Sequence, residues 1–347
     1  MPPVLFEERL LDSGARLGVA TLNIPEKLNA LSLELVGLLL AKLRAWSTDD
    51  RICAVVLEGA GTRAFCAGGD VLAIHRSGGA KDGQSYARAF FAVEYTLDHL
   101  IHTFGKPILA WGSGIVMGGG VGLLAGCSHR IATETTRLAM PEVAIGLYPD
   151  VGGSYILSRV PERLGLFLAL TGATIGGSDA RLLGLVDRLV RADEKARVLA
   201  AVPWNDLVET PCEPGPLERQ HAAVVRACRH DTLEEVVAAI VALNGDEWLT
   251  KAQHGLQAAC PGSLRLSWEA QARARTMSLA DVFRMEHDLS IRRVQDADFA
   301  EGVRARLVDK DQKPRWSPAT LGAATAAWAA PFFVPLSTPE AHPLRAL

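Results

Sequence analysis

The sequence predicts an α/β fold over residues 1–195, followed by a helical region over residues 196–347. Two observations support this. Short apolar stretches alternate with segments of helical periodicity through the first region, as in proteins that pack helices on a sheet. After residue 195 the strand-like stretches end, and segments rich in Ala, Glu and Arg follow a stretch with four prolines between residues 203 and 216. We therefore expect two domains that meet at residues 195 and 196.

Each element of the first region has a local signal. The predicted strands cover residues 16–23, 52–58, 107–111 and 130–133. The predicted helices cover residues 33–47, 86–103, 120–126, 161–170 and 178–186. Ser32 precedes the first helix as its N-cap, Ser178 caps the segment 178–186, and Pro161 occupies the first position of a third helix. In the second region, helical patterns cover residues 217–229, 232–243, 263–274 and 279–295.

The composition excludes several classes of protein. The 347 residues are 49% hydrophobic, which is enough for a large core. The net charge of -3 leaves no basic excess, so we expect no nucleic-acid partner. Six cysteines without a C-x-x-C pair indicate reduced thiols, and we expect no metal site. The N-terminal residues carry no targeting pattern, so we expect a cytoplasmic location.

One uncharged segment, residues 107–126, is long enough to span a membrane. Three consecutive glycines at positions 118–120 are unfavourable inside any helix. We therefore predict a buried strand, a glycine-rich turn and a buried helix, and no association with a membrane.

Two glycine-rich loops are candidates for binding a ligand through the backbone. Residues 64–70 (AFCAGGD) follow a predicted strand, and residues 117–122 (MGGGVG) lie between a strand and a helix start. Backbone N–H groups at a helix start point toward bound anions, and two N–H groups from separate loops can form an oxyanion hole. The alternative is that both loops are tight packing turns.

Two carboxylates lie in the mainly apolar segment 140–153 (MPEVAIGLYPDVGG). Glu142 and Asp150 in such surroundings are either paired or functional, and either can act as general base, nucleophile or general acid. The alternative is structural, with Glu142 capping a turn and Asp150 capping the next helix.

Taken together, these segments and residues 25–31 (PEKLNAL) resemble, in order, the crotonase (enoyl-CoA hydratase/isomerase) superfamily. The resemblance implies a spiral of ββα units with a helical C-terminal region, and an acyl-CoA substrate. It also implies an oxyanion hole formed by the N–H groups of Gly69 and Gly119, with substrate contacts at Ala67, Gly68 and Gly118. No separate cofactor is expected, because coenzyme A is part of the substrate.

Hydratases of this superfamily carry two catalytic glutamates, and this sequence keeps only one of them. The first position is Gly122, which has no side chain, and the second is Glu142. Glu142 together with Asp150 resembles the 3-hydroxyisobutyryl-CoA hydrolases of the superfamily. Glu94, with Tyr95 beside it, resembles a substrate-contacting pair of that group. Residues 298–316, with Met285 and Glu286 upstream, resemble its closing segment.

This resemblance implies hydrolysis of a short 3-hydroxyacyl-CoA thioester, 3-hydroxyisobutyryl-CoA in particular, by catalytic Glu142 and Asp150, as in valine breakdown. One alternative is an enoyl-CoA hydratase or isomerase that uses Glu142 alone. Another is a catalytically silent acyl-CoA-binding protein on the same scaffold. The superfamily also implies a homo-oligomer as one state of the chain.

Overall fold

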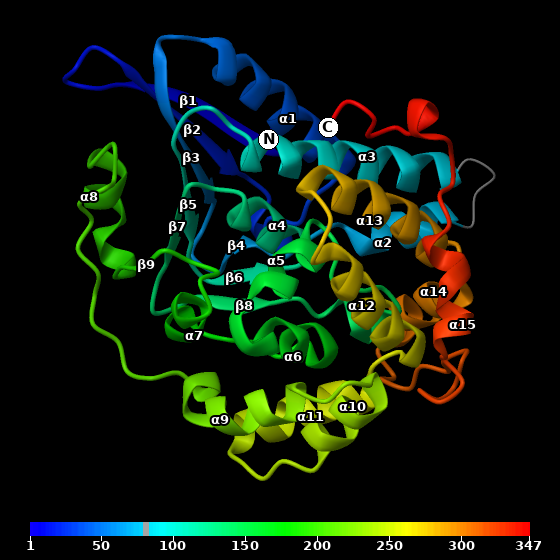
Figure 1. Ribbon diagram of the computed structural model, residues 1–347. Helices are drawn as coiled ribbons and strands as arrows, with labels where there is room; N and C mark the ends of the chain where they lie inside the picture. The colour runs from blue at the N-terminus through cyan, green and yellow to red at the C-terminus, as the bar shows by residue number, and fades with distance from the viewer. Residues whose placement is uncertain (79–82) are drawn as a thin grey trace. The chain divides into compact units, whose positions relative to one another are not determined.

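Six strands form the main sheet, in the order β1–β2–β3–β5–β7–β9 (Figure 1). They are β1 (Val4–Leu10), β2 (Arg16–Leu22), β3 (Ile52–Gly59), β5 (Ile108–Gly112), β7 (His129–Ala132) and β9 (Arg188–Leu189). The first pair is antiparallel and the remaining pairs are parallel. A second sheet has the order β4–β6–β8, with β4 (Ala64–Cys66), β6 (Ile115–Met117) and β8 (Arg137–Ala139).

This computed structural model describes residues 1–78 and 83–347. The chain forms two compact units, each assembled from separate stretches of sequence. The first unit comprises residues 1–69, 96–138 and 175–215, and the second comprises residues 70–95, 139–174 and 216–347. The predicted domains are instead two continuous stretches that meet between residues 195 and 196. This division stays a prediction.

The first unit holds both sheets, except for Ala139 at the end of β8, together with its helices. These are α1 (Leu33–Thr48), α4 (Gly119–Ala125), α7 (Gly177–Leu182), α8 (Lys195–Ala200), and the short 3-10 turns η1 (Pro25–Lys27) and η4 (Ala192–Glu194). Ser32 caps α1 as predicted, because its side chain accepts a hydrogen bond from the Leu35 N–H (3.1 Å). One face of the main sheet packs into a core with Val56, Leu109 and Trp204.

The second unit is built mainly of helices. They are α2 (Val71–Gly78), α5 (Gly153–Arg159), α6 (Leu164–Thr171), α9 (Pro216–Cys228), α10 (Leu233–Val241), α11 (Glu247–Ala258), α12 (Pro261–Ala274), α13 (Leu279–Val294), α14 (Ala297–Val303), α15 (Ala326–Ala329), the π-helical turn η5 (Arg304–Val308) and the 3-10 turns η2 (Glu142–Ile145), η3 (Pro161–Arg163), η6 (Ala330–Phe333) and η7 (Pro339–Ala341). Helix α3 (Gly83–His102) contributes residues to both units. Helices α9, α10 and α11 pack on one another (Figure 1).

Most predicted elements are confirmed, and two predictions are wrong in detail. Pro161 begins a 3-10 turn, and α6 starts only at Leu164, because Glu162 and Arg163 have positive φ. Helix α7 is capped by Gly176 rather than by Ser178. Ser178 lies inside the helix, after Gly177, and Gly177 packs so closely on β9 that a Cβ there would lie 2.5 Å from a Leu189 methyl group.

Residues 107–126 contain the predicted buried strand, β5, and the predicted buried helix, α4. They also contain a second strand, β6, which pairs with β4, and α4 begins at Gly119, inside the glycine triplet. Among the described residues, the structure contains no helix whose length and apolar character would let it cross a membrane.

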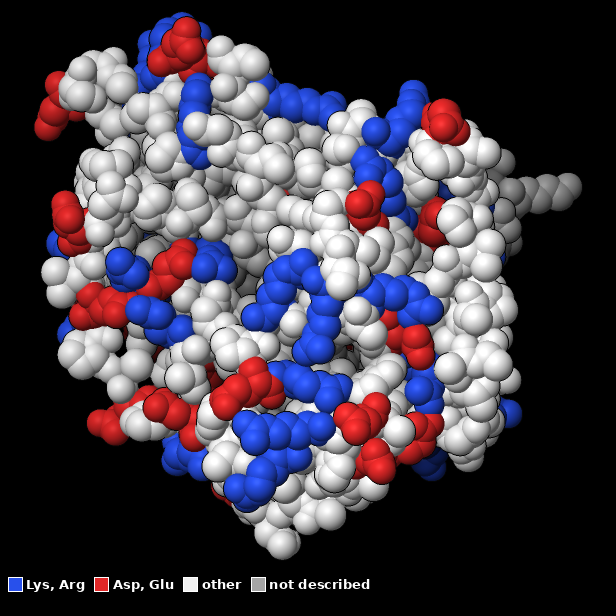
Figure 2. All heavy atoms as spheres, viewed as in Figure 1, with Lys and Arg blue, Asp and Glu red and all other residues white. Residues whose placement is uncertain are grey.

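Acidic and basic side chains are interspersed on the face of the molecule drawn in Figure 2. Several pairs come from neighbouring turns of one helix, such as Lys251 with Glu247 (2.7 Å) and Arg284 with Asp281 (2.7 Å). The absence of a nucleic-acid partner stays a prediction from the net charge.

Candidate active site

The two glycine-rich loops lie side by side within the first unit. Strands β4 and β6 pair in parallel, with Ala64 opposite Ile115 and Cys66 opposite Val116. The carboxyl ends of parallel strands meet at one edge of a sheet, so the loops that follow them are neighbours. The loop after β4 contains Gly68, and the loop after β6 leads directly into α4.

Two positions in these loops accept no side chain. Gly68 has φ of +96°, and a Cβ there would lie 3.0 Å from the carbonyl oxygen of Met117. A Cβ on Gly120 would lie 2.3 Å from the carbonyl oxygen of Cys66, which is closer than atoms can approach. The glycines therefore allow the two backbones to touch, which is the requirement for a site built from main-chain groups.

The predicted oxyanion-hole residues occupy these touching loops. Gly119 is the first residue of α4, where N–H groups have no partner within the helix. Gly69 forms an isolated parallel bridge with Leu31, whose N–H donates to the carbonyl of Gly68 (2.8 Å). Ala67 is held by its own N–H, which donates to the carbonyl of Leu28 (3.0 Å). Two backbone N–H donors in adjacent loops can stabilise a negative charge that develops on an oxygen atom. That Gly69 and Gly119 form such an oxyanion hole remains a proposal.

Glu142 begins the turn η2 in the second unit and is 7% exposed. Its Oε2 atom is buried and has no hydrogen-bond partner among the residues that the structure describes. Burial raises the pKa of the Glu142 carboxyl well above its ordinary value, and the nearby charge of Asp150 raises it further. A buried carboxyl oxygen without a partner is costly to maintain, which makes it a candidate for contact with a substrate or a water molecule.

Asp150 lies eight residues further along the same segment and is 5% exposed. Its Oδ2 atom accepts a hydrogen bond from the Tyr95 hydroxyl (2.5 Å), and Ser290 Oγ lies 3.5 Å from the same atom. Burial raises the pKa of Asp150 to about 6, and the hydrogen bond from Tyr95 opposes this rise. Asp150 is therefore an acid that titrates close to neutrality.

The two carboxyls differ in proton affinity although they are close enough to influence each other. Asp150 has a hydrogen-bond donor that favours its charged form, whereas Glu142 Oε2 has none among the described residues. As the pH rises, Asp150 ionises first and its charge then hinders the ionisation of Glu142. Two carboxyls whose pKa values are pushed apart can divide the acid and base roles of a reaction.

Helix α13 supports the segment between the two carboxyls from one face. Glu286, Ser290 and Arg293 are spaced four and three residues apart, which places them on one side of the helix. Arg293 donates to the carbonyl of Gly146 through Nε (2.9 Å) and Nη2 (2.6 Å). The Tyr148 hydroxyl donates to the carbonyl of Glu286 (2.8 Å) and lies 3.0 Å from Ser290 Oγ.

The expected substrate contact Glu94 is 2% exposed on α3. Its neighbour Tyr95 is fully buried and reaches both Asp150 and Ser290 Oγ (2.8 Å). A role of Glu94 in substrate binding stays a proposal. The structure thus brings Tyr95, Ser290 and Asp150 into one hydrogen-bonded group in the second unit.

The sequence interpretation missed the supporting roles of Ser290, Tyr148 and Arg293. Glu286 entered it only through resemblance. A signal was present in α13, where Glu286 and Arg293 are polar residues on a helix whose other buried positions include Phe283 and Leu289. Large charged residues are seldom buried unless they are paired. Charged residues that share the apolar face of a helix therefore indicate contacts with distant parts of the chain.

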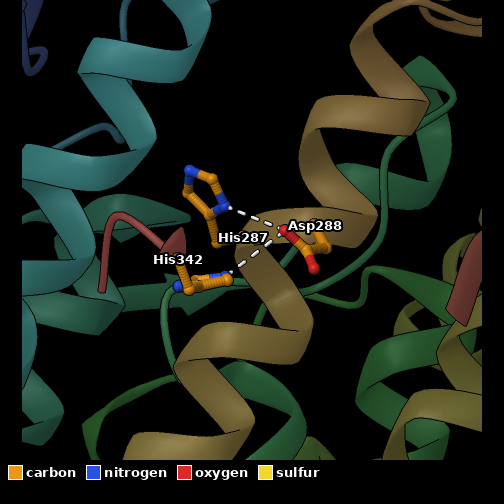
Figure 3. Close-up of side chains that lie close together, drawn as sticks. All are labelled: His287, Asp288 and His342. Atoms are coloured by element: carbon orange, nitrogen blue, oxygen red, sulfur yellow. Dashed lines mark hydrogen bonds and ion pairs between the residues drawn. The ribbon is translucent and has the colours of Figure 1, made fainter. Parts of the chain in front are cut away.

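One group of buried side chains has the composition of a metal site. It consists of His287 and Asp288 on α13 and His342 near the C-terminus (Figure 3). His287 Nδ1 and His342 Nε2 each lie 3.3 Å from Asp288 Oδ1. The Leu344 N–H donates to His342 Nδ1 (2.9 Å), so the neutral ring carries its proton on Nε2, facing Asp288.

A metal ligand must offer a lone pair at the coordinating nitrogen, and the protonated Nε2 of His342 does not. The group therefore fits a polar contact between α13 and the C-terminal segment better than a cation site. Asp288 also accepts the Leu336 N–H through Oδ2 (3.0 Å), which adds a second link to that segment. That the protein needs neither a metal nor a separate cofactor stays a prediction.

Comparison with known proteins gives consistent matches over most of the chain. A family model described as enoyl-CoA hydratase/isomerase matches residues 17–333. The chain is 38% identical to a mitochondrial 3-hydroxyisobutyryl-CoA hydrolase of Danio rerio, covering 90% of this chain and 86% of that protein. It is 36% identical to the protein of the same name from Homo sapiens, covering 91% of this chain and 85% of that protein.

Solved structures agree with the fold expected from the sequence. An enoyl-CoA hydratase from Rhodobacter sphaeroides superposes with a TM-score of 0.88 at 35% identity, covering 96% of this chain and 98% of that one. A carnitinyl-CoA dehydratase from Mycobacterium thermoresistibile gives 0.88 at 37% identity, covering 97% and 98%. The expected fold class is therefore confirmed.

The expected cytoplasmic location is wrong. The curated relatives from Danio rerio, Gallus gallus and Homo sapiens are all named as mitochondrial proteins. The expectation rested on the first residues of the sequence alone, and those residues do not decide the compartment.

Proposed function

Because this chain belongs to the enoyl-CoA hydratase/isomerase family, we propose that it hydrolyses the thioester of 3-hydroxyisobutyryl-CoA. The products are the free hydroxy acid and coenzyme A. The observation that carries the proposal is the pair of buried carboxyls Glu142 and Asp150, which are electrostatically coupled within one compact unit. The curated relatives that cover about 90% of the chain are named for this reaction.

The alternative activity, hydration of an enoyl-CoA, has weaker support from the residues. The resemblance to hydratases requires a second glutamate where this chain has Gly122 on α4. Glycine at this position supplies no acid or base. Asp150 supplies the second carboxyl instead.

The proposed reaction begins with polarisation of the thioester carbonyl. The N–H groups of Gly69 and Gly119 donate to the carbonyl oxygen and stabilise the charge that develops on it. One such donor typically lowers the barrier by about 3 kcal/mol. Ala67, Gly68 and Gly118 are proposed to contact the substrate through their backbone, and Glu94 through its side chain.

Glu142 acts either as the nucleophile or as the general base. In the first case, the ionised form of Glu142, which burial and the charge of Asp150 disfavour, attacks the carbonyl carbon, the C–S bond breaks, and water then hydrolyses the mixed anhydride. In the second, Glu142 takes a proton from a water molecule that attacks directly. In both, the coenzyme A sulfur leaves and takes up one proton. Asp150 orients the substrate hydroxyl or the water and assists proton transfer.

The test is the release of free thiol, followed with a chromogenic disulfide. We expect rapid release from 3-hydroxyisobutyryl-CoA and little from crotonyl-CoA. Glu142→Gln and Asp150→Asn should each lower kcat by at least about 10²-fold, the low end for general acid–base catalysis. Glu301→Gln is a matched control, because Glu301 is a partly exposed carboxylate of the same unit that pairs with Arg304.

Two results would contradict the proposal. Loss of the enoyl absorbance of crotonyl-CoA without release of thiol would identify a hydratase that works with one glutamate. Tight binding of coenzyme A in a titration calorimeter without turnover of either substrate would identify a silent acyl-CoA-binding protein. A homo-oligomer, also implied by the family, is tested separately by light scattering.

A further inference from the structure

The backbone directly after Asp150 adopts a costly conformation. Val151 has φ of +54°, and Gly152 has φ of +81°. A β-branched residue in the left-handed region is a rare outlier, and such a residue persists only where its surroundings hold it. The turn is closed by the Gly153 N–H, which donates to the carbonyl of Asp150 (2.6 Å). The position of Asp150 therefore depends on whatever holds this turn.

Glu286 supplies that hold from α13. Its carboxyl is fully buried, and each oxygen accepts one backbone N–H from the turn. Oε2 accepts from Gly152 (2.7 Å) and Oε1 accepts from Ser154 (2.9 Å). The two N–H groups lie on either side of Gly153, where α5 begins. A carboxyl group that bridges two N–H groups in this way fixes both the position and the direction of the backbone.

The same helix also holds the side chain of Asp150. Ser290 lies one turn after Glu286 and contacts both Tyr95 and Asp150. Phe283 lies one turn before Glu286 and packs against Gly152, where a Cβ would lie 3.1 Å from its ring. Backbone and side chain of Asp150 are thus tied to one face of α13.

Glu286 and Asp150 also interact through charge. Burial, followed by the charge of Asp150, raises the pKa of Glu286 to about 8. The hydroxyls of Tyr95 and Tyr148 belong to the same group, and the charge of Glu286 acts on both. Burying a second carboxyl beside a catalytic one costs stability. A neutral amide in its place would have a single acceptor oxygen and could not accept both N–H groups.

We propose that Glu286 is a positioning residue for Asp150 in thioester hydrolysis, acting by holding the Val151–Gly152 turn through two backbone hydrogen bonds. The inference rests on the proposed function, in which Asp150 takes part in the reaction. Glu286 touches no reacting atom in this scheme, and its whole effect on the rate passes through Asp150.

The test is a double-mutant cycle on kcat with Glu286→Gln and Asp150→Asn. In the wild-type background, Glu286→Gln should lower kcat by about tenfold to a hundredfold, because a small misplacement of a catalytic group has this effect. KM should change by no more than about twofold. In the Asp150→Asn background, the same substitution should change the residual kcat by less than about twofold, because the residue it positions is already gone.

Asp288→Asn is the matched control for lost stability. Asp288 lies on the same helix and also accepts a backbone N–H, but it has no contact with the turn after Asp150 among the described residues. It should lower the thermal midpoint while leaving kcat within about twofold. Should Glu286→Gln fail to fold, Glu286→Asp takes its place in the cycle. It keeps the carboxyl group but withdraws it from the two N–H groups.

The outcomes separate the two proposals. Absence of thiol release by the wild-type enzyme refutes the proposed function and this inference with it. Normal release by the wild type, with an equal loss from Glu286→Gln in both backgrounds, refutes the inference alone. Loss of kcat in Asp288→Asn equal to that in Glu286→Gln also refutes it, because both losses would then follow from instability.

Discussion

Relative to the wild type, the Asp150→Asn protein should become more resistant to unfolding as the pH rises. The same substitution should remove activity. The pKa of Asp150 is raised from its ordinary value of 3.8 to about 6 by burial. A raised carboxyl pKa means that the folded protein binds this proton more tightly than the unfolded chain does. The stabilising effect is complete below pH 3.8 and is lost as the pH rises through about 6.

The magnitude follows from the same two values. One pH unit corresponds to about 1.4 kcal/mol, so the ionised Asp150 of the folded enzyme costs about 3 kcal/mol relative to a neutral side chain. About half of this cost, or about 1.5 kcal/mol, accumulates between pH 5 and pH 8. The charge of Asp150 also helps to raise the pKa of Glu286, so Asp150→Asn should lower that pKa. This lower pKa further increases the stability of the variant relative to the wild type as the pH rises.

The assay is urea unfolding followed by tryptophan fluorescence at pH 5 and at pH 8. The free energy of unfolding of Asp150→Asn minus that of the wild type should increase by at least about 1.5 kcal/mol between the two pH values. Any cost of the new amide that does not depend on pH cancels in this comparison. The amide oxygen of the introduced side chain can still accept the Tyr95 hydroxyl, so the main hydrogen bond is retained.

Glu301→Gln serves as the control for the pH comparison. The pKa of Glu301 is lowered to about 2 by its hydrogen bonds with Arg304, so this carboxyl is ionised in the folded protein throughout the range. Its effect on the free energy of unfolding should be nearly constant from pH 5 to pH 8. A stability difference for Asp150→Asn that stays constant or shrinks as the pH rises would show that Asp150 does not titrate as the structure implies.

Two further predictions follow from single contacts. Tyr95→Phe removes the hydroxyl that favours ionised Asp150, so the pKa of Asp150 should rise above about 6, and the acid limb of the kcat profile should move to higher pH in thiol-release assays. Gly120→Ala places a Cβ 2.3 Å from the Cys66 carbonyl oxygen and should destabilise the protein by at least about 1–3 kcal/mol in urea unfolding. Gly37→Ala in α1 is the control, because no atom lies within 4 Å of the added Cβ. It should stabilise the protein by about 1 kcal/mol, since alanine favours a helix more than glycine does. Equal effects of both substitutions would contradict the packing argument.

The sequence by itself determined the features that depend on local patterns. Helix α1 and its Ser32 cap follow from periodicity and from a hydrogen bond that spans three residues. The strand and glycine turn of residues 107–126 follow from an uncharged run that three consecutive glycines interrupt. The two loops and the two carboxylates were recognisable because their residue types stand together in short segments.

Only the tertiary structure decided how Asp150 is held and how it titrates. The contact between Tyr95 and Asp150 spans 55 residues, and the contact between Glu286 and Gly152 spans 134. Hydrogen bonds between such distant positions leave no periodic trace in the sequence. The close approach of Gly177 in α7 to Leu189 of β9 is likewise a contact between distant positions. The pKa of a carboxyl is set by the groups that surround it after folding, so the division of protons between Glu142 and Asp150 is a property of the folded chain alone.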